Sequence, residues 1–296
     1  MLRSFFTRLK SGTEYLNYGR HILRDWGAQA FRERGFGLES QPFRVLDLGC
    51  GHGTDLKNIR GEIERRYPND DLRQVVELHG VESYPPYIAE CRAEGIRTHS
   101  LNIERDLYPG EDGSFDVIVA NQILEHTKEI FWIFAECARL LKPGGYFLIG
   151  VPNLASLHNR FLLFLGQQPT QIKSMSAHVR GFTKPDMREF AQTGGLFRLR
   201  AYRGSNFYPL PPLLSKPLAR VFPTLAWGSF YRLERTEADG DFLTCLGGDE
   251  NFLETPFYGS PQNPAKQRAN NRRKVVKKKP AAKKKKPAAA ARARKK

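Results

Sequence analysis

Three clustered glycines beside an acid are the first residues of this sequence that could hold a ligand. The stretch VLDLGCGHGTDL places Gly49, Gly51 and Gly53 directly after a short apolar run, and Asp47 stands two residues before the first glycine. The spacing G-x-G-x-G differs from the G-x-G-x-x-G fingerprint of dinucleotide sites. A carboxylate here would repel a pyrophosphate but would attract a positively charged amino group or a sulfonium.

Two further polar positions follow predicted strands and could bind a nucleoside. Glu82 ends an apolar run, and a carboxylate at such a strand tip can accept hydrogen bonds from both hydroxyls of a ribose. Asn102 and Ile103 follow the next run, where an amide can meet an adenine amino group while an aliphatic side chain packs on the ring. The simpler alternatives are a solvated surface acid at Glu82 and an ordinary turn residue at Asn102.

The elements that must position these residues alternate along the chain. The apolar patterns predict strands over 43–48, 75–82, 96–101, 115–120, 146–151, 197–202 and 229–235. They predict helices over 13–34, 55–66, 86–94, 130–141 and 184–192, with Pro143-Gly144-Gly145 forming a turn before the fifth strand. This alternation is typical of an α/β fold with a doubly wound, mostly parallel sheet. Ligands of such sheets bind at the carboxyl ends of the strands, where the glycine turn lies.

The ordered motifs resemble the class I S-adenosylmethionine-dependent methyltransferases, and among them the group that includes ubiquinone-biosynthesis O-methyltransferases. The resemblance covers 40–155 through VLDLGCGHGTDL, Glu82, SFDVIVANQILEHTKE and RLLKPGGYFLIGVPN, and it extends more weakly through HVRGFTKPDMREFAQTGGLFRL over 178–199. It implies a Rossmann-like sheet of seven strands with the last strand antiparallel, and S-adenosylmethionine as the cofactor.

The resemblance also implies a cofactor pocket. In the family the first motif holds the methionine part, the acid of the second strand holds the ribose, and residues after the third strand hold adenine. The tip of the fourth strand lines the sulfonium. The adenine position is often Asp, so Asn102 departs from the family pattern. The residues expected to bind the cofactor are Asp47, Gly49, Cys50, Gly51, Gly53, Glu82, Ser83, Asn102, Ile103, Asn121 and Gln122.

Three residues are candidates for catalysis. Glu125 and His126 follow the fourth strand, near the expected methyl group, and His126 could take a proton from an acceptor. His178 is a second candidate base, with a surface loop histidine as the alternative. Ubiquinone-type relatives read E-x-x-E-H at the first position, where the acids and the histidine can bind a divalent metal. Here Gln122 replaces one acid, and because hard cations prefer carboxylates we assign no metal ligand.

The acceptor is expected to contact the segments 1–40, 153–183 and 204–228. Residues 157–166 predict a short apolar helix, and 213–227 place Leu214, Leu218, Val221 and Leu225 on one helical face. These segments are expected to form a lid packed on the core, or alternatively a surface for a lipid-like acceptor or a membrane interface. The chain has ANQI in place of the Asn/Asp-Pro-Pro-Tyr motif of DNA adenine and protein glutamine methyltransferases. O-methylation of a small-molecule, sugar or lipid-like acceptor is therefore favoured.

The charge of the chain is concentrated in a tail. Of 47 Lys and Arg, 16 lie in 266–296 without a single acid, so the other residues are formally neutral. The composition predicts a disordered tail that binds polyanions without reading sequence. Two alternatives therefore stay open: an RNA methyltransferase tethered by this tail, and a non-catalytic protein with a methyltransferase fold.

The predicted organisation is an N-terminal helical cap over 1–40, a methyltransferase domain over 41–236 that includes the insert 204–228, a loop-rich extension over 237–265, and the tail. MLRSFFTRLK lacks the apolar core of a signal peptide, and no apolar stretch is long enough to span a membrane. The four cysteines form no CxxC pair, which favours reduced thiols in a cytoplasmic protein.

Overall fold

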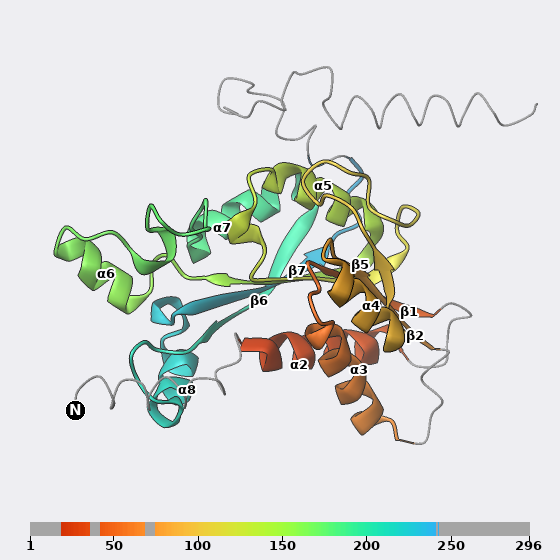
Figure 1. Ribbon diagram of the computed structural model, residues 1–296, viewed down its shortest axis with the longest axis horizontal. Helices are drawn as coiled ribbons and strands as arrows, with labels where there is room; N and C mark the ends of the chain where they lie inside the picture. The colour runs from red at the N-terminus through yellow and green to blue at the C-terminus, as the bar shows by residue number, and fades with distance from the viewer. Residues whose placement is uncertain (1–18, 36–41, 69–74, 241, 243–296) are drawn as a thin grey trace, which may run out of the picture. The chain divides into compact units, whose positions relative to one another are not determined.

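The central element of the fold is a seven-stranded sheet with helices on both faces (Figure 1). The computed structural model describes residues 19–35, 42–68, 75–240 and 242. The strands are β1 (Phe43–Leu48), β2 (Val76–Val81), β3 (Arg97–His99), β4 (Phe115–Asn121), β5 (Leu141–Pro152), β6 (Phe197–Ser205) and β7 (Gly228–Arg235). The helices are α2 (Arg20–Arg34), α3 (Thr54–Arg66), α4 (Pro85–Ala93), α5 (Ile130–Leu140), α6 (Leu157–Phe164), α7 (Lys184–Gln192) and α8 (Pro212–Val221).

The strand order is β3-β2-β1-β4-β5-β7-β6. β1 pairs in parallel with β2 and β4, while β7 runs antiparallel to both β5 and β6. The predicted α/β fold, with a seven-stranded and mostly parallel sheet and an antiparallel last strand, is confirmed. Because β1, β2 and β4 are parallel neighbours, their carboxyl ends lie at one edge of the sheet, and the residues that follow them are brought together there.

The two faces of the sheet bury different side chains. In Figure 1, α2 and α3 lie below the sheet and α5 and α7 above it. Leu148 of β5 belongs to the core between the sheet and the helices α2 and α3. The ring of its neighbour Phe147 lies 5.2 Å from that of Phe134 in α5, on the other face. Successive residues of a strand point to opposite faces, so a strand buried on both sides reads as a continuous apolar run. This is why β1, β4 and β5 were recognisable in the sequence.

The predicted start of the fifth strand after a turn at Pro143-Gly144-Gly145 is wrong, because these residues lie inside β5. The strand begins at Leu141, which pairs with Phe115, and the pairing shifts register before Tyr146 pairs with Val117. A Cβ on Gly145 would lie 2.9 Å from the carbonyl oxygen of Asp116, so only glycine fits this irregularity.

The insert 204–228 contains α8, and only part of its apolar pattern packs inward. Leu218 and Leu225 pack against a small core formed by Phe207, Ala219 and Ala226. Leu214 and Val221, expected on the same buried face, are 52% and 68% exposed. The helix presents two apolar sides, one of which faces solvent.

Several expectations fall outside the described residues. Of the predicted N-terminal cap, the structure describes α2 from Arg20 to Arg34, with Gly19 at its N-terminus, and residues 1–18 lie outside the described part of the chain. Most of the loop-rich extension and the whole tail 266–296 also lie outside, so the domain boundaries stay predictions. Within the described residues, Cys50, Cys91 and Cys137 are buried free thiols. None of the described helices has the length and apolar character needed to cross a membrane.

Candidate active site

The glycine turn joins β1 to α3 in a backbone conformation that favours glycine. Gly49, Gly51 and Gly53 have φ values of 68°, 51° and 68°, all in the left-handed region. A Cβ on Gly53 would lie 2.5 Å from Cδ1 of Ile96, whereas a Cβ on Gly51 would meet nothing within 4 Å. Gly53 is therefore required by close packing, and Gly51 keeps a main-chain segment open to a ligand.

The tip of β2 reaches across to this turn. One carboxylate oxygen of Glu82 accepts a hydrogen bond of 2.9 Å from the backbone N–H of Gly51. The other oxygen accepts hydrogen bonds of 2.8 and 2.9 Å from the backbone N–H groups of Ser83 and Tyr84. Glu82 is thus held by local donors with its carboxylate turned toward the turn, as the predicted ribose contact requires.

A second acidic group lies under the turn. Asp47 and Asp55 are both buried, and Asp55 follows the last glycine at the start of α3. Arg20 of α2 donates to Asp55 at 2.8 Å, and the Nδ2 of Asn121 donates to the same carboxylate oxygen at 3.0 Å. The other oxygen of Asp55 has no hydrogen-bond partner among the residues that the structure describes.

Burial and then the charge of Asp55 raise the pKa of Asp47 well above its usual range. Burial also raises the pKa of Asp55, against the lowering effect of Arg20. Two buried carboxylates, of which Asp55 is paired with Arg20, form a site that a further cation would stabilise. Arg20 and Asp55 were missed in the sequence: Asp55 stands just past the glycines, but nothing local to Arg20 indicates its role.

The residues predicted to contact adenine lie at the same edge of the sheet, but the side chain of Asn102 makes a local hydrogen bond there. Asn102 is exposed, and its side-chain oxygen accepts from the backbone N–H of Glu104 at 2.9 Å. This is the local turn contact given above as the alternative for Asn102. Glu104 in turn accepts from the backbone N–H groups of Lys128 and Glu129 at 2.6 and 3.1 Å, which ties this loop to the residues after β4. Ile103 is half-buried beside it.

The three candidate catalytic residues meet, although His178 is distant in sequence from Glu125 and His126. The rings of His126 and His178 lie 4.6 Å apart, and the backbone N–H of Val179 donates to the carbonyl oxygen of Glu125 at 2.8 Å. Glu125 is 1% exposed, and its Oε2 has no partner within the described part of the chain. Burial raises the pKa of Glu125 to about 7.

The hydrogen bonds of the two imidazoles fix which nitrogen is free. Nδ1 of His126 lies 3.3 Å from the carbonyl oxygen of Ala177, and Nδ1 of His178 lies 2.7 Å from that of Gln171. A carbonyl oxygen only accepts, so each Nδ1 is the donor of its hydrogen bond, and Nε2 is the nitrogen of each ring that is left to accept a proton. One ligand atom from each of Glu125, His126 and His178 lies within 4.8 Å of the others, which also suits a metal ion.

A small cavity of about 30 Å³ lies beside the end of β4. Gln122 and Asn206 line it, and these are the two described non-glycine residues with positive φ, 56° and 66°. Left-handed backbone at bulky residues costs free energy and is concentrated at functional sites. The cavity is completed by Pro152, Ser205, Trp227, Gly228 and Phe230. No pattern in the sequence indicated Ser205 or Asn206.

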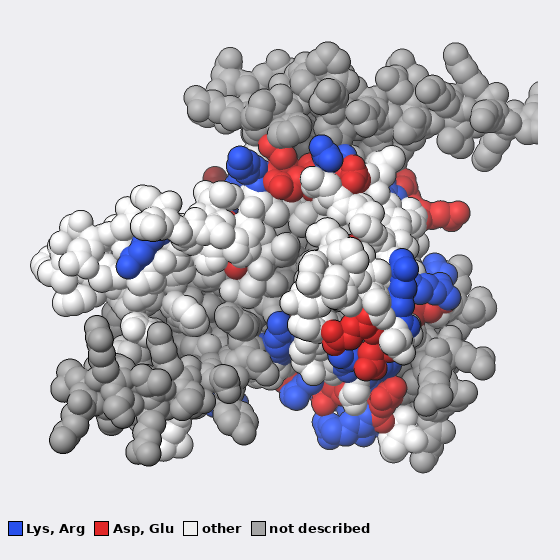
Figure 2. All heavy atoms as spheres, in the orientation of Figure 1, with Lys and Arg blue, Asp and Glu red and all other residues white. Residues whose placement is uncertain are grey.

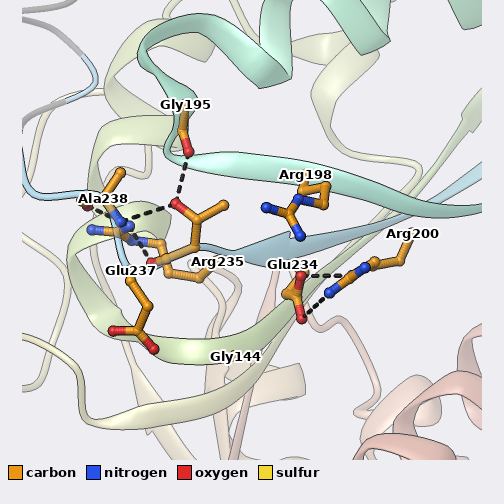
Figure 3. Close-up of a pocket in the computed structure, with 9 residues that line it drawn as sticks. Gly144, Gly195, Arg198, Arg200, Glu234, Arg235, Glu237 and Ala238 are labelled. Carbon is orange, nitrogen blue, oxygen red and sulfur yellow. Dashed lines mark hydrogen bonds and ion pairs between the residues drawn. The ribbon is translucent and has the colours of Figure 1, made fainter.

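A more open cavity of about 490 Å³ lies at the opposite edge of the sheet (Figure 3). It is formed where β5 and β6 begin and β7 ends, and it is lined by Arg198, Arg200 and Glu234 among others. Arg200 binds both carboxylate oxygens of Glu234 at 2.6 and 3.0 Å. None of the predicted site residues lines this cavity, so it is separate from the glycine turn.

Comparisons with known proteins agree with this geometry. A family model described as a methyltransferase domain matches residues 15–197, which is more than half of the chain. A ubiquinone biosynthesis O-methyltransferase of Xanthomonas oryzae is 32% identical over 113 residues, covering 37% of this chain and 43% of that protein. A probable S-adenosylmethionine-dependent methyltransferase of Mycolicibacterium smegmatis is 28% identical over 151 residues, 51% of each chain.

Among solved structures, a 1,6-didemethyltoxoflavin N1-methyltransferase of Burkholderia thailandensis with bound S-adenosylhomocysteine has 17% identity and a TM-score of 0.45, over 80% of this chain and 88% of that one. The chain spans less than half the length of the first curated relative. The extent of the family match and the ordered motifs lead to one conclusion: this chain belongs to the methyltransferase domain family, the class I S-adenosylmethionine-dependent methyltransferases, whose cofactor is S-adenosylmethionine.

Proposed function

We propose that this protein transfers the methyl group of S-adenosylmethionine to a hydroxyl oxygen of a small-molecule, sugar or lipid-like acceptor. The bound cofactor would supply a methyl group on a sulfonium, already activated for displacement. The residues present fit this ligand. Asp47 and Asp55 form a buried acidic site suited to the positive methionine end, and Glu82 is oriented toward the turn where a ribose would lie.

The catalytic half of the proposal rests mainly on one observation: a ring nitrogen of His126 and a carboxylate oxygen of the buried Glu125 lie within 4.8 Å of each other, while Nδ1 of His126 faces the carbonyl oxygen of Ala177. An acceptor hydroxyl loses its proton as its oxygen attacks, and a neutral imidazole next to an acid is suited to accept it. Nε2 of His126 would take the proton, and the neighbouring Glu125 would stabilise the resulting imidazolium. The remaining task of the chain is to align the acceptor and exclude water, which alone lowers a barrier substantially.

The small cavity at Gln122 and Asn206 is the proposed end of the acceptor site. Its volume of about 30 Å³ is that of roughly one water molecule, so an acceptor needs the insert 204–228 to open. Asn153 at the end of β5 holds this insert by donating to the carbonyl oxygens of Thr224 and Ala226 at 2.9 and 2.8 Å. This position supports the predicted lid.

Glu125, His126 and His178 also fit a divalent cation, which when bound would polarise an acceptor hydroxyl as a Lewis acid. A chelator distinguishes catalysis by a general base from catalysis by a metal ion. We expect turnover with an identified acceptor to survive treatment with EDTA, and a loss that added Zn²⁺ or Mg²⁺ restores would replace the base by a metal.

The direct test is His126→Gln, assayed with radiolabelled cofactor against hydroxyl acceptors fractionated from cell extracts. A general base contributes about 100-fold or more to the rate, so we expect kcat/KM to fall by at least that factor with the affinity for S-adenosylhomocysteine unchanged. His158→Gln is the matched control, since both nitrogens of His158 lie against hydroxyls of Ser156 and Thr170. A His126→Gln rate within twofold of wild type would remove His126 as the base.

The basic tail favours a second candidate, a tethered RNA methyltransferase. Deleting residues 266–296 separates the two functions. We expect turnover of the small acceptor to survive the deletion. If methyl transfer requires both RNA and the tail, the RNA candidate replaces the proposed function.

A further inference from the structure

The exposed apolar side chains of this protein are concentrated on two segments. Apart from Tyr84 and Leu107, the large apolar residues described as exposed all lie between 157 and 222. On α6, Phe161 is 61% exposed and Phe164 is 86% exposed, and on α8, Leu213 is 84% exposed. We define as the apolar surface the exposed members of α6 and the insert: Leu157, Phe161, Leu163, Phe164, Leu165, Tyr208, Leu213, Leu214, Val221 and Phe222.

The two segments of this surface are neighbours. The ring of His158 in α6 lies 5.3 Å from that of Tyr208 in the insert. Asn153, just before α6, is hydrogen-bonded to the end of the insert through Thr224 and Ala226. Figure 1 shows α6 and α8 on the same side of the molecule, away from α4. The exposed side chains therefore form one region beside the proposed acceptor cavity.

The charge around the apolar surface has one sign. Residues 153–182 and 196–233 contain no Asp or Glu, although the whole chain has 31. Arg160 and Lys173 lie exposed on the first segment, and Lys216 and Arg220 lie exposed on the second. Figure 2 shows the surface over α6 as white with a blue patch and no red. Acids are present elsewhere on the described surface, so their absence here distinguishes this face.

We infer that the apolar surface is a membrane-binding face that inserts into the interface of an anionic lipid bilayer. α6 has 8 residues and α8 has 10, which is too short to cross a bilayer, so these helices would lie in its interface. Exposed Phe and Leu side chains would enter the acyl boundary while Arg160, Lys216 and Arg220 contact phosphate groups. A second copy of the chain fits less well, because it would bring these cations together without carboxylates to pair with them.

The basic tail supplies a second attraction to the same partner. Its 16 Lys and Arg attract an anionic leaflet without any apolar contact, and stable attachment generally needs two such signals. The proposed membrane attachment does not depend on which acceptor the enzyme methylates.

The test is flotation of the full-length protein with phosphatidylcholine vesicles, with and without one third phosphatidylglycerol. We expect binding to the anionic vesicles, and we expect Phe161→Ser/Phe164→Ser to weaken the partition coefficient by at least about tenfold. Leu107→Ser is the matched control, because Leu107 is 47% exposed outside the apolar surface and should leave binding unchanged. Thermal melting of each variant verifies that it folds.

Two further arms separate the apolar surface from the tail and from self-association. Deleting 266–296 should weaken vesicle binding and reduce its salt dependence. The vesicle binding that remains should be lost when Phe161→Ser/Phe164→Ser is added to the deletion. If the double variant floats as well as wild type, or if the deletion abolishes all binding and RNA competes for the tail, the inference fails in favour of a nucleic-acid tether. It also fails if wild type ignores the vesicles and the Phe substitutions convert a dimer into a monomer.

Discussion

The substitution Glu82→Gln tests how the cofactor is held at the edge of the sheet. The change keeps the shape of the side chain and removes its charge. In the structure both carboxylate oxygens accept backbone hydrogen bonds, one from Gly51 at 2.9 Å and the other from Ser83 and Tyr84 at 2.8 and 2.9 Å. An amide has one acceptor oxygen, so its NH₂ group must face either Gly51 or the Ser83–Tyr84 pair, where it meets another donor.

The expected loss follows from the charge. Hydrogen bonds to a charged acceptor contribute about 1.5–3 kcal/mol, about twice a neutral bond. Losing the charge-assisted bonds to a ribose should therefore weaken cofactor affinity by about 10- to 100-fold. The rate at saturating cofactor should change little, because the proposed partner of Glu82 is the ribose and not the reacting methyl group.

The assay is calorimetric titration of S-adenosylhomocysteine into each variant, followed by kcat and KM for the cofactor. Glu94→Gln is the control, since Glu94 is an exposed acid that follows α4. We expect a raised Kd and KM with kcat preserved for Glu82→Gln, and no change for Glu94→Gln. A Kd within twofold of wild type for Glu82→Gln would refute the assignment of Glu82 to the ribose.

Two predictions concern stability. Gly53→Ala should destabilise the cofactor-free protein by about 1–3 kcal/mol, because φ is 68° and the new Cβ would lie 2.5 Å from Ile96. Gly61→Ala in α3, whose new Cβ would meet nothing within 4 Å, should stabilise the protein by about 0.5–1 kcal/mol. Urea unfolding measures the stability of both variants, and equal effects would contradict the packing described for the glycine turn. His79 of β2 lies 3.3 Å from His99, and burial followed by the His99 charge lowers its pKa to about 4. The neutral form is favoured on folding, so stability present above pH 6.5 should fall by about 3 kcal/mol as the pH drops toward 4, and His79→Gln should lose less. An equal loss of stability for the two proteins over this pH range would exclude His79 as the cause.

The fold was predictable because its signals are local. Continuous apolar runs separated by glycine and proline turns located the strands, and the antiparallel β7 followed from the family resemblance. The irregular start of β5 was missed because a Pro-Gly-Gly sequence after a helix normally forms a turn, and only the pairing of Leu141 with Phe115 shows that the strand already begins before it. The outward side of α8 was missed because an apolar helical face normally packs on a core, whereas Leu214 and Val221 face solvent.

The site was only partly predictable, since much of it depends on contacts between distant residues. The glycine turn and Glu82 could be placed from strand ends alone. Arg20 reaches Asp55 from a helix that precedes β1, and no local pattern marks it. His126 and His178 were each predicted as candidates. The carbonyl oxygens of Ala177 and Gln171 orient the two rings only because the loop that carries them is hydrogen-bonded to Glu125, which the sequence alone does not show.

The central claim is that a buried acidic site under the glycine turn and the carboxylate of Glu82 together bind a positively charged nucleoside. Titration of the full chain with S-adenosylhomocysteine over a range of pH tests it most directly. Burial keeps the pKa of Asp47 well above its usual range in the free protein, and an ammonium group bound beside it would favour the charged carboxylate, so the affinity should fall as the pH is lowered through the range in which Asp47 takes up its proton. An absence of binding heat at millimolar ligand, or an affinity that does not fall on acidification, would contradict the claim.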